Sequence, residues 1–316
     1  MREVQSDVDY FAVVKTMIDN IITDIRVVYN ATSYLFNEAV WAPSFMLPTA
    51  DTAVRQLSFD YHQVDLEMGE MFLNFPMPTR LQSYLGVRTE AVVPVMNQLK
   101  GPMSWRKVIL TVKEVWTRML MGFRPNPYNS VKHYYHAEEF IIGDHAELDN
   151  PFRWDRVILN LTGQSLFDPR VPWVYKKDDA RDCIAGAAVT FVDDSRASGK
   201  DAEHAWQVGW RFTKRLYYLG IQNAARKIRP PSTAPGAWAG AVKETSLGNI
   251  NKFVTQEKWE KARKILDRII KELDESGDGK LDYKQLERDR GFLAHMVITY
   301  TVINAYLKGI HQTLDS

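Results

Sequence analysis

The sequence predicts an α+β fold in which a mixed core of strands and helices is followed by a C-terminal pair of helices. Short apolar runs rich in β-branched residues, separated by polar turns, occur through most of the chain. In the C-terminal region the apolar residues recur at helical spacing instead. With 316 residues and no internal repeat, the chain is long enough for two or three small domains.

The composition is that of an ordinary globular protein, with 45% hydrophobic and 25% charged residues. No apolar run approaches the roughly 20 residues that span a bilayer, and the N-terminus lacks the apolar segment of a secretory signal. The single cysteine, Cys183, excludes an internal disulfide and fits a reducing, intracellular compartment. A net charge of +1 is low for a nucleic-acid-binding protein, so such binding would depend on local basic stripes.

The first part of the chain is predicted to contain a hairpin over residues 10–30, where two β-rich runs flank a mixed segment. Residues 31–60 are expected to be mostly loop. The apolar stretch 64–75, with carboxylates set in it, indicates a strand that runs into a helix. From Trp105 onward, apolar residues fall on one face of a predicted helix that stops at Gly122.

The middle of the chain begins with residues 143–180, which are rich in Asp and Pro and are interpreted as a long insertion. Residues 187–192 predict a strand that leads into a turn and a second strand. Residues 202–218 are expected to be helical, with aromatic residues on one side, and residues 237–242 suit a small hairpin.

Two C-terminal helices are predicted to form a hairpin. Thr255 is a suitable N-cap and Glu257 lies in the first turn of a helix that continues to about residue 273. A second helix is expected over residues 292–310, again from apolar residues at helical spacing.

Two adjacent acids, Asp193 and Asp194, follow the apolar strand that ends at Phe191. Their charges repel each other, and burial without a counter-ion is costly. Magnesium resolves such a conflict because it prefers hard oxygen ligands, and a pair of magnesium ions can activate a 3′-hydroxyl and stabilise a pyrophosphate leaving group. The alternative is a solvated hairpin turn, which these residues taken alone favour.

A second acidic cluster lies upstream at Asp65, Glu67 and Glu70. A metal site at the first cluster needs a further carboxylate from a different strand, and this segment is able to supply one. The alternative interpretation is an amphipathic helix whose acids face solvent.

The order of these motifs over most of the chain resembles the palm of reverse transcriptases. The first palm motif is an Asp followed by an aromatic residue and a Pro, and Phe72 and Pro76 align its metal-binding Asp with Glu67. The resemblance implies that Phe72 excludes ribonucleotides and that Glu70 lies near the triphosphate. It also implies that Asp193 and Asp194 hold metal with Glu67.

Three further palm motifs have matches in the sequence. The resemblance implies that the loop from Gly122 to Pro127, which includes Asn126, backs the incoming nucleotide. It implies that Lys227 protonates the leaving pyrophosphate. The primer grip is matched by Trp238, Ala239 and Gly240.

The first hairpin resembles the finger strands whose basic residues clamp the triphosphate, here Lys15 and Arg26. Arginine suits this role because its planar fork binds phosphate oxygens bidentately, although a single basic residue without this register is better explained as a solvated surface charge. The segment from Tyr34 to Asn37 also fits the family. The closest resemblance is to reverse transcriptases of eukaryotic retrotransposons.

The resemblance implies a right-hand polymerase fold with fingers in 1–62, a palm in 63–245 that contains the 143–180 insertion, and a helical thumb or connection segment in 246–316. It implies an RNA-directed DNA polymerase, a nucleotidyltransferase that uses an RNA template, a DNA primer, deoxynucleoside triphosphates and two Mg²⁺ ions. No membrane partner is expected.

The main departure from the family is Glu67, which stands where the family has Asp. The extra methylene moves the carboxylate by about 1.5 Å, and magnesium demands near-ideal geometry. Asp65 is a second candidate ligand because residues two apart on a strand face the same side. The alternative function is therefore a catalytically degenerate or domesticated module that binds nucleic acid or another protein.

Residues 274–285 resemble an EF-hand calcium loop, with oxygen ligands at most of the expected positions. Gln285, however, stands where the loop needs a bidentate Glu, and there is only one such loop. A polar turn between two thumb helices is the favoured interpretation, and calcium binding is not expected.

Overall fold

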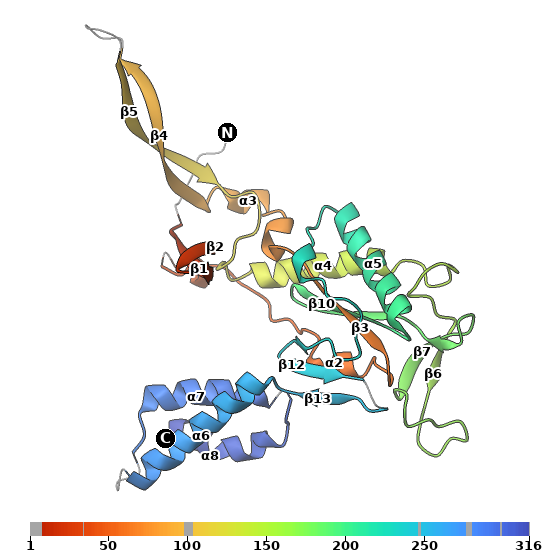
Figure 1. Cartoon of the computed structure of the whole chain (residues 1–316). Coiled ribbons are helices and arrows are strands. Elements are labelled where there is room, and N and C mark those ends of the chain that lie inside the picture. The colour runs from red at the N-terminus through yellow and green to blue at the C-terminus, as the bar shows by residue number, and fades with distance from the viewer. Residues whose placement is uncertain are drawn as a thin grey trace. The chain divides into compact units, whose positions relative to one another are not determined.

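The computed structural model describes residues 8–33, 35–97, 104–245, 248–275, 280–297 and 299–315 (Figure 1). These residues form antiparallel sheets and helices, including C-terminal helices, so the predicted α+β class is confirmed. The chain divides into two compact units. Unit 1 comprises residues 1–46, 70–138 and 220–222, and unit 2 comprises residues 47–69, 139–219 and 223–316. The fingers, palm and thumb boundaries remain predictions.

Unit 1 contains two hairpins and several helices. Its described elements are β1 (Tyr10–Ile18), β2 (Ile21–Tyr29), α1 (Phe36–Ala39), the 3-10 helix η1 (Met71–Asn74), α3 (Thr79–Gln82), β4 (Gly86–Asn97), β5 (Ser104–Val115) and most of α4 (Asn126–Ile142). The predicted hairpin over 10–30 is confirmed. Asp19 and Asn20 at its tip have positive φ angles of 49° and 63°, which is the backbone that a tight two-residue turn requires.

The helix predicted from Trp105 onward is wrong. β5 pairs with β4 without a register break, from Gly86 opposite Val115 to Asn97 opposite Ser104. The β5 sequence contains several β-branched residues, which favour a strand, and a short apolar run does not by itself separate a helix from a strand. A partner strand that hydrogen-bonds along its full length decides the outcome.

Unit 2 is built around a three-stranded antiparallel sheet in the order β3–β10–β9. Its described elements are α2 (Ala50–Val54), β3 (His62–Glu67), the end of α4, β6 (Arg156–Leu159), β7 (Val174–Asp178), β8 (Cys183–Ile184), β9 (Ala187–Phe191), β10 (Asp194–Gly199), α5 (Ala202–Tyr218), the 3-10 helix η2 (Ala225–Lys227), β11 (Ala237–Trp238), β12 (Ala241–Glu244), β13 (Asn251–Phe253), α6 (Gln256–Glu275), α7 (Tyr283–Met296) and α8 (Ile303–Asp315). The strands predicted around Asp193 and the strand-to-helix passage over 64–75 are confirmed.

The two faces of the β3–β10–β9 sheet have different character. α5 covers one face, where Gly209 lies close to the side chains of Val64 and Leu66 (Figure 1). Because side chains alternate along a strand, Asp65 and Glu67 belong to the opposite face. The sheet therefore separates an apolar, helix-covered side from a side that carries carboxylates.

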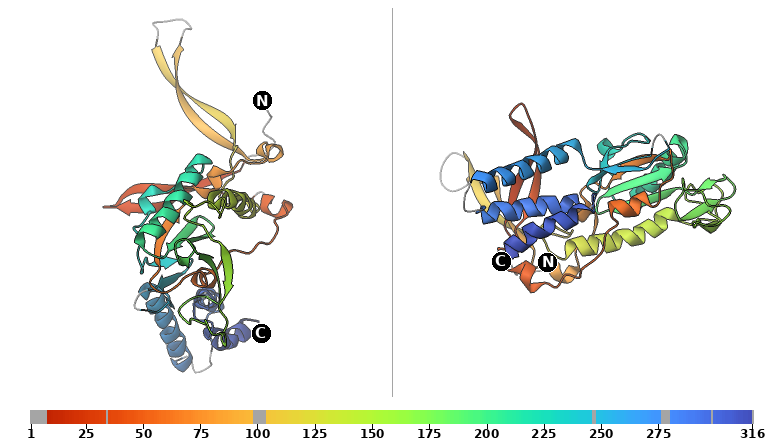
Figure 2. Two further views of the ribbon diagram at one scale, coloured as in Figure 1. Left: turned by 90° about the vertical axis from the view of Figure 1, so that its right-hand side faces the viewer. Right: turned by 90° about the horizontal axis from the view of Figure 1, so that it is seen from below.

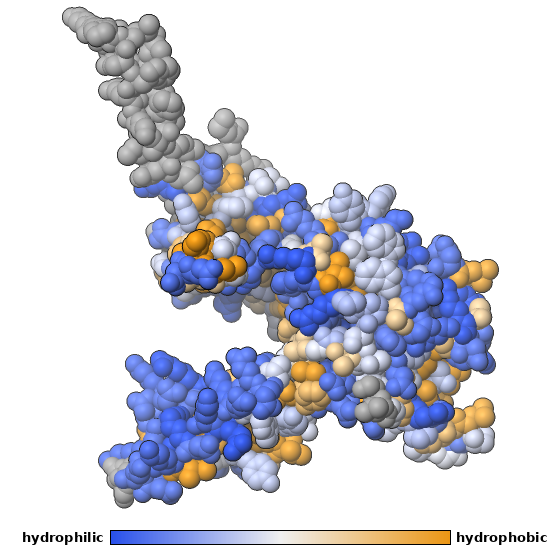
Figure 3. All heavy atoms as spheres, in the orientation of Figure 1, coloured by the Kyte–Doolittle hydropathy of each residue, from blue (hydrophilic) through white to orange (hydrophobic). Residues whose placement is uncertain are grey.

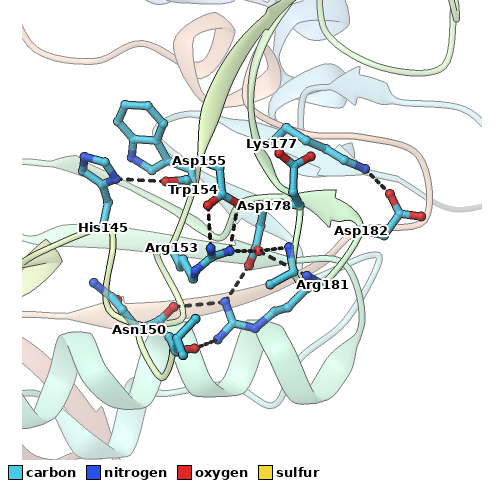
Figure 4. Close-up of polar contacts among 12 residues, drawn as sticks. His145, Asn150, Arg153, Trp154, Asp155, Lys177, Asp178, Arg181 and Asp182 are labelled. Carbon is cyan, nitrogen blue, oxygen red and sulfur yellow. Dashed lines mark hydrogen bonds and ion pairs between the residues drawn. The ribbon is translucent and has the colours of Figure 1, made fainter.

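The residues of the predicted insertion include β6 and β7, which form a three-stranded sheet with β8 just beyond it. An ionic network ties this sheet to the loop before β6 (Figure 4). Asp178, which is fully buried, lies between the guanidinium groups of Arg153 and Arg181. Arg153 also binds Asp155, and Arg181 donates to the Asn150 carbonyl oxygen at 3.1 Å. Each charge in this network has a partner of opposite sign, which is the pattern of a structural ion cluster.

The C-terminal helices α6, α7 and α8 pack on one another (Figure 2, in blue) around the buried residues Val254, Ala262, Ile265, Leu293, Met296 and Leu307. The helix predicted from Thr255 is confirmed. The single helix predicted over 292–310 is wrong, because α7 ends at Met296 and α8 begins at Ile303. The residues between them include Val297, Thr299, Thr301 and Val302, which are β-branched and form helices poorly. No helix in the described ranges combines the length and apolar character that crossing a bilayer requires.

Candidate active site

The antiparallel register of β3 and β10 brings the two acidic clusters of the sequence together. Glu67 lies directly opposite Asp194, and the Met68 backbone N–H donates to the Asp193 carbonyl oxygen at 2.9 Å. Residues opposite each other in an antiparallel pair project from the same face. Glu67 and Asp194 therefore share the carboxylate-bearing face of the sheet, as the palm resemblance leads one to expect.

The turn between β9 and β10 holds the aspartates in a strained backbone. Val192 has a φ of 58°, a left-handed conformation that a β-branched residue rarely adopts. Strain of this kind costs about 1–3 kcal/mol and gathers at functional sites. The conformation of Val192 marks this turn as a candidate functional site.

Partial burial together with repulsion between carboxylates distinguishes this hairpin from a solvated turn. Burial, followed by the charges of Asp193 and Glu67, raises the pKa of Asp194 from 3.8 to about 6. A carboxyl group with a raised pKa beside two other acids is a site that a cation would stabilise.

Lys227 is placed against Glu67 by the segment that follows α5. This segment runs along the free edge of β3, with Asn223 bridging to Met68 and the Ala224 N–H donating to the Glu67 carbonyl oxygen at 2.9 Å. The Lys227 ammonium then forms an ion pair with the Glu67 carboxylate. The resemblance to reverse transcriptases implied that Lys227 acts in proton transfer, but it did not indicate an ion pair with Glu67.

A hollow of about 250 Å³ opens beside these residues. Acidic and basic side chains both line it, together with one aromatic residue: Asp65, Glu67, Asp194, Arg226, Lys227, Arg229 and Trp238. The mixture of signs suits a ligand that carries both phosphate groups and cations.

Asp65 is engaged elsewhere on the same face. Its carboxylate accepts hydrogen bonds from the Arg196 guanidinium at 2.6 and 3.0 Å. Arg196 is buried, so withdrawing Asp65 to a metal would leave a desolvated guanidinium without its partner. Between the two acids of β3, Glu67 is therefore the better metal-ligand candidate.

The donor chemistry of the site fits magnesium, since Asp193, Asp194 and Glu67 offer only hard carboxylate oxygens. In the described ranges, no three Asp, Glu, His or Cys side chains stand in an arrangement able to hold a metal ion. The Glu67 carboxylate forms an ion pair with Lys227.

The predicted primer grip is a tight hairpin between β11 and β12. Ala239 and Gly240 at its turn have φ angles of 46° and 85°, so the hairpin predicted over 237–242 is confirmed. Trp238 is buried, and the Lys243 ammonium nitrogen lies 3.9 Å from the centroid of its indole ring. Burial is the main cause that lowers the pKa of Lys243 from 10.5 to about 7.

The sequence did not indicate a role for Lys243, because a single lysine in a short strand is usually a surface residue. Its side chain is fully buried, and its ammonium nitrogen has no hydrogen-bond partner among the described residues. Only the packed hairpin reveals this position.

The residues predicted to bind the nucleotide belong to unit 1. Lys15 on β1 forms an ion pair with Asp24 on β2 at 3.5 Å, and Arg26 lies on β2 opposite Val13. Phe72 lies in η1, and Glu70 precedes it with a φ of 48°. Their predicted roles remain predictions.

The loop from Gly122 to Pro127 is held by contacts within unit 1. Gly122 has a φ of 101°, and a Cβ atom there would lie 2.2 Å from the Tyr29 carbonyl oxygen, so glycine is required. Asn126 is buried and donates to the Leu120 carbonyl oxygen at 2.8 Å. Asn37, for which the sequence suggested no specific role, donates to the Gly122 carbonyl oxygen at 3.0 Å and accepts from the Arg124 N–H at 2.8 Å.

Two predicted features lie partly outside the described residues. One is the segment that resembles a calcium loop, of which residues 276–279 are not described, and the other is the finger segment, of which Tyr34 is not described.

No protein-family model and no curated protein matches the chain. Two solved structures of a foamy viral protease–reverse transcriptase are similar to it. For the complex with double-stranded DNA, the TM-score is 0.51 at 14% identity, covering 93% of this chain and 36% of that chain. For the complex with an RNA/DNA hybrid, the TM-score is 0.52 at 13% identity, covering 92% and 28%. The fold is therefore that of reverse transcriptases, and the chain spans about a third of the length of those proteins.

Proposed function

We propose that this chain is an RNA-directed DNA polymerase of a eukaryotic retroelement that catalyses nucleotidyl transfer with two magnesium ions. The placement of Glu67 directly opposite Asp194, next to Asp193, is the observation that carries the proposal. The similar foamy viral proteins were solved with double-stranded DNA and with an RNA/DNA hybrid, which supports a primer–template as the ligand.

In the proposed reaction, Asp193, Asp194 and Glu67 would hold the magnesium ions. When bound, these ions activate the primer 3′-hydroxyl and stabilise the pyrophosphate leaving group. The ammonium of Lys227, which pairs with Glu67 in this structure, would donate a proton to the leaving group once released. Arg226 and Arg229 line the same hollow and are suited to bind phosphate oxygens.

The roles proposed for unit 1 rest on the resemblance alone. Lys15 and Arg26 would grip the triphosphate, Glu70 would lie near it, and Phe72 would exclude the ribose 2′-hydroxyl. Residues 1–62, 63–245 and 246–316 would then act as fingers, palm and thumb.

Primer extension tests this function directly. The full chain, supplied with an RNA template, a DNA primer, deoxynucleotides and magnesium, is expected to extend the primer. Asp193→Asn keeps the side-chain size but removes a ligand charge, and it should lower extension by about 10²-fold or more. Binding of the primer–template, measured by fluorescence anisotropy, should persist in this variant. Equal extension by Asp193→Asn and the parent chain would refute the proposal.

A second candidate function is a catalytically degenerate module that binds nucleic acid or a protein without extending a primer. The ion pair between Lys227 and Glu67 favours it, because an internal cation already neutralises the carboxylate that a metal needs. Retained duplex binding without any extension, at all magnesium concentrations, would identify this function.

A further inference from the structure

The exposed side of α5 carries an aromatic and basic stripe that the proposed active site does not use. Four residues spaced one helical turn apart form this α5 stripe, namely Trp206, Trp210, Lys214 and Tyr218. The side chains of Trp206, Trp210 and Tyr218 are 43%, 58% and 78% exposed. Residues four apart lie above one another on a helix, with a rise of about 6 Å, so the stripe is continuous.

The α5 stripe lies on the side of the sheet away from the carboxylates. α5 packs on the face that carries Val64 and Leu66, whereas Glu67 and Asp194 share the other face. In the space-filling view, the surface over α5 is mostly pale, between the hydrophilic and hydrophobic ends of the scale (Figure 3). A ligand on the α5 stripe would therefore not occupy the candidate active site.

An aromatic stack closes one end of the α5 stripe. The rings of Tyr218 and Phe140 are nearly parallel, with centroids 5.8 Å apart and an interplanar angle of 19°. The Arg215 guanidinium lies 5.2 Å from the centroid of Phe140. A planar, electron-rich group can extend such a stack on the exposed ring of Tyr218.

Two arginines supply a rigid basic edge beside the aromatic rings. Arg215 donates to the Phe140 carbonyl oxygen at 2.6 Å, and Arg211 donates to that of Ile141 at 3.3 Å. These contacts hold both guanidinium groups at the C-terminal end of α4, so little side-chain entropy remains to be lost on binding. Burial and the charge of Arg215 lower the pKa of Arg211, so an anion between them would be stabilising.

The groove between α5 and the end of α4 measures about 500 Å³. Lys214 lines it and forms no ion pair with any described residue. Asp149 is the one acid among the described residues that line the groove, whereas Arg211, Lys214 and Arg215 are basic. Glu147 lies 3.6 Å from Arg211, and Glu203 on α5 accepts a hydrogen bond from Gln207. Basic groups therefore outnumber acidic ones in the lining of the groove.

We propose that the α5 stripe and the adjoining groove bind single-stranded nucleic acid. Bases would stack on the exposed rings, and the phosphates would contact Lys214 and the two arginines. Aromatic platforms next to basic side chains are the common means of holding single strands without reading their sequence. A neutral or basic polypeptide would leave these charges uncompensated, so the charge pattern favours a polyanion.

Binding of a short, fluorescein-labelled oligouridylate to the full chain, measured by anisotropy in EDTA, tests the proposal. The double variant Trp210→Ala/Tyr218→Ala should bind about tenfold more weakly or worse, because each stacked base contributes substantially. Trp173→Ala is the matched control, since Trp173 is 70% exposed and lies outside the stripe. It should bind like the parent chain.

Two further measurements separate this site from its alternatives. Lys214→Ala should reduce the slope of log K against log salt by about 0.7, the value for one contact with a single strand. Saturating double-stranded primer–template should not displace the oligouridylate. An unchanged affinity in the double variant overturns the proposal, as does displacement by the duplex. So does stripe-dependent binding of an acidic Glu–Tyr copolymer without oligouridylate binding, which would indicate a protein partner.

Discussion

Two clusters of charged residues in unit 2 differ in how their charges are arranged. In the Asp178 network, hydrogen bonds from Arg181 and Arg153 outweigh burial and lower the pKa of the Asp178 carboxyl below its ordinary value (Figure 4). In the Glu67–Asp194 cluster, burial and neighbouring acids raise the pKa of Asp194 to about 6. The first arrangement satisfies its charges internally. In the second, burial and the charges of Asp193 and Glu67 outweigh the attraction of Lys227 for Asp194.

This difference separates structural acids from candidate catalytic acids. A buried carboxylate surrounded by arginines contributes to the fold and has no free coordination for a ligand. Acids that face each other reduce stability, and such a pattern persists where an external cation or a proton is part of the function. Lys243 is the cationic counterpart of this second pattern, because its buried ammonium lies against Trp238 and has no hydrogen-bond partner among the described residues.

The largest expected effect on stability is in the Asp178 network. Asp178→Ala leaves Arg153 and Arg181 without their shared carboxylate, and the free energy of unfolding should fall by about 3 kcal/mol. Urea titration followed by circular dichroism measures it. Asp182→Asn is the control, because the Asp182 carboxylate is 92% exposed and Asn, like Asp, tolerates the positive φ of 48° at this position; it should leave stability nearly unchanged. Similar losses in both variants would mean that Asp178 is not the structural centre of the network.

The next effect concerns the buried ammonium of Lys243. Lys243→Met removes a buried amine while keeping the side-chain length, and it should raise the free energy of unfolding by about 2 kcal/mol at pH 7. The pKa of Lys243 in the folded chain, about 7, lies below its ordinary value of 10.5. Between these two pH values the unfolded chain binds more protons than the folded chain, so the free energy of unfolding of the parent chain should rise from pH 7 to 10.5. The variant should lack this rise in a thermal-unfolding series. A destabilised variant would show that the ammonium stabilises the hairpin.

A smaller gain in stability is expected in the Glu67–Asp194 cluster. Asp194→Asn removes repulsion from Asp193 and Glu67, and it should stabilise the chain by about 1 kcal/mol at pH 7 after allowance for solvent screening. Primer extension should be lost at the same time. An increase in stability without loss of extension would remove Asp194 from the proposed site.

The pH dependence of this variant gives an independent check. The folded pKa of Asp194, about 6, lies above its ordinary value of 3.8. The folded chain therefore binds more protons between these values, and its stability should increase as the pH falls from about 6 to 3.8. Asp194→Asn should remove that contribution. Magnesium should weaken it in the parent chain if the ion binds there, because a bound cation favours the charged carboxylate.

Sequence reasoning anticipated the local parts of this site and missed its long-range pairs. The β9–β10 hairpin with Asp193 and Asp194 was predictable because an apolar run and a turn signal lie next to each other in the chain. The contact of Asp65 with Arg196 joins residues 131 positions apart, and that of Lys227 with Glu67 joins residues 160 apart. No local pattern encodes such partners.

The same limit explains the error at β5. Its apolar residues satisfy a helical period, and only the pairing with β4 selects the strand. The resemblance to reverse transcriptases compensated for this limit in one respect, because it indicated that Glu67 belongs beside Asp194 before any strand register was known.

The smallest expected effect tests the alignment of Glu67 with the metal-binding Asp of the first palm motif, and the ion pair of Glu67 with Lys227. Glu67→Asp shortens the side chain by about 1.5 Å, which weakens its reach to Lys227 and restores the residue found in the family motif. Extension should be preserved or rise a few-fold, since less energy is needed to free the carboxylate for magnesium. Steady-state extension rates at several magnesium concentrations measure it, with the exposed Glu38→Asp as a control. A clear fall in rate, with primer–template binding unchanged, would show that Glu67 is not the residue that occupies the Asp position of the first palm motif.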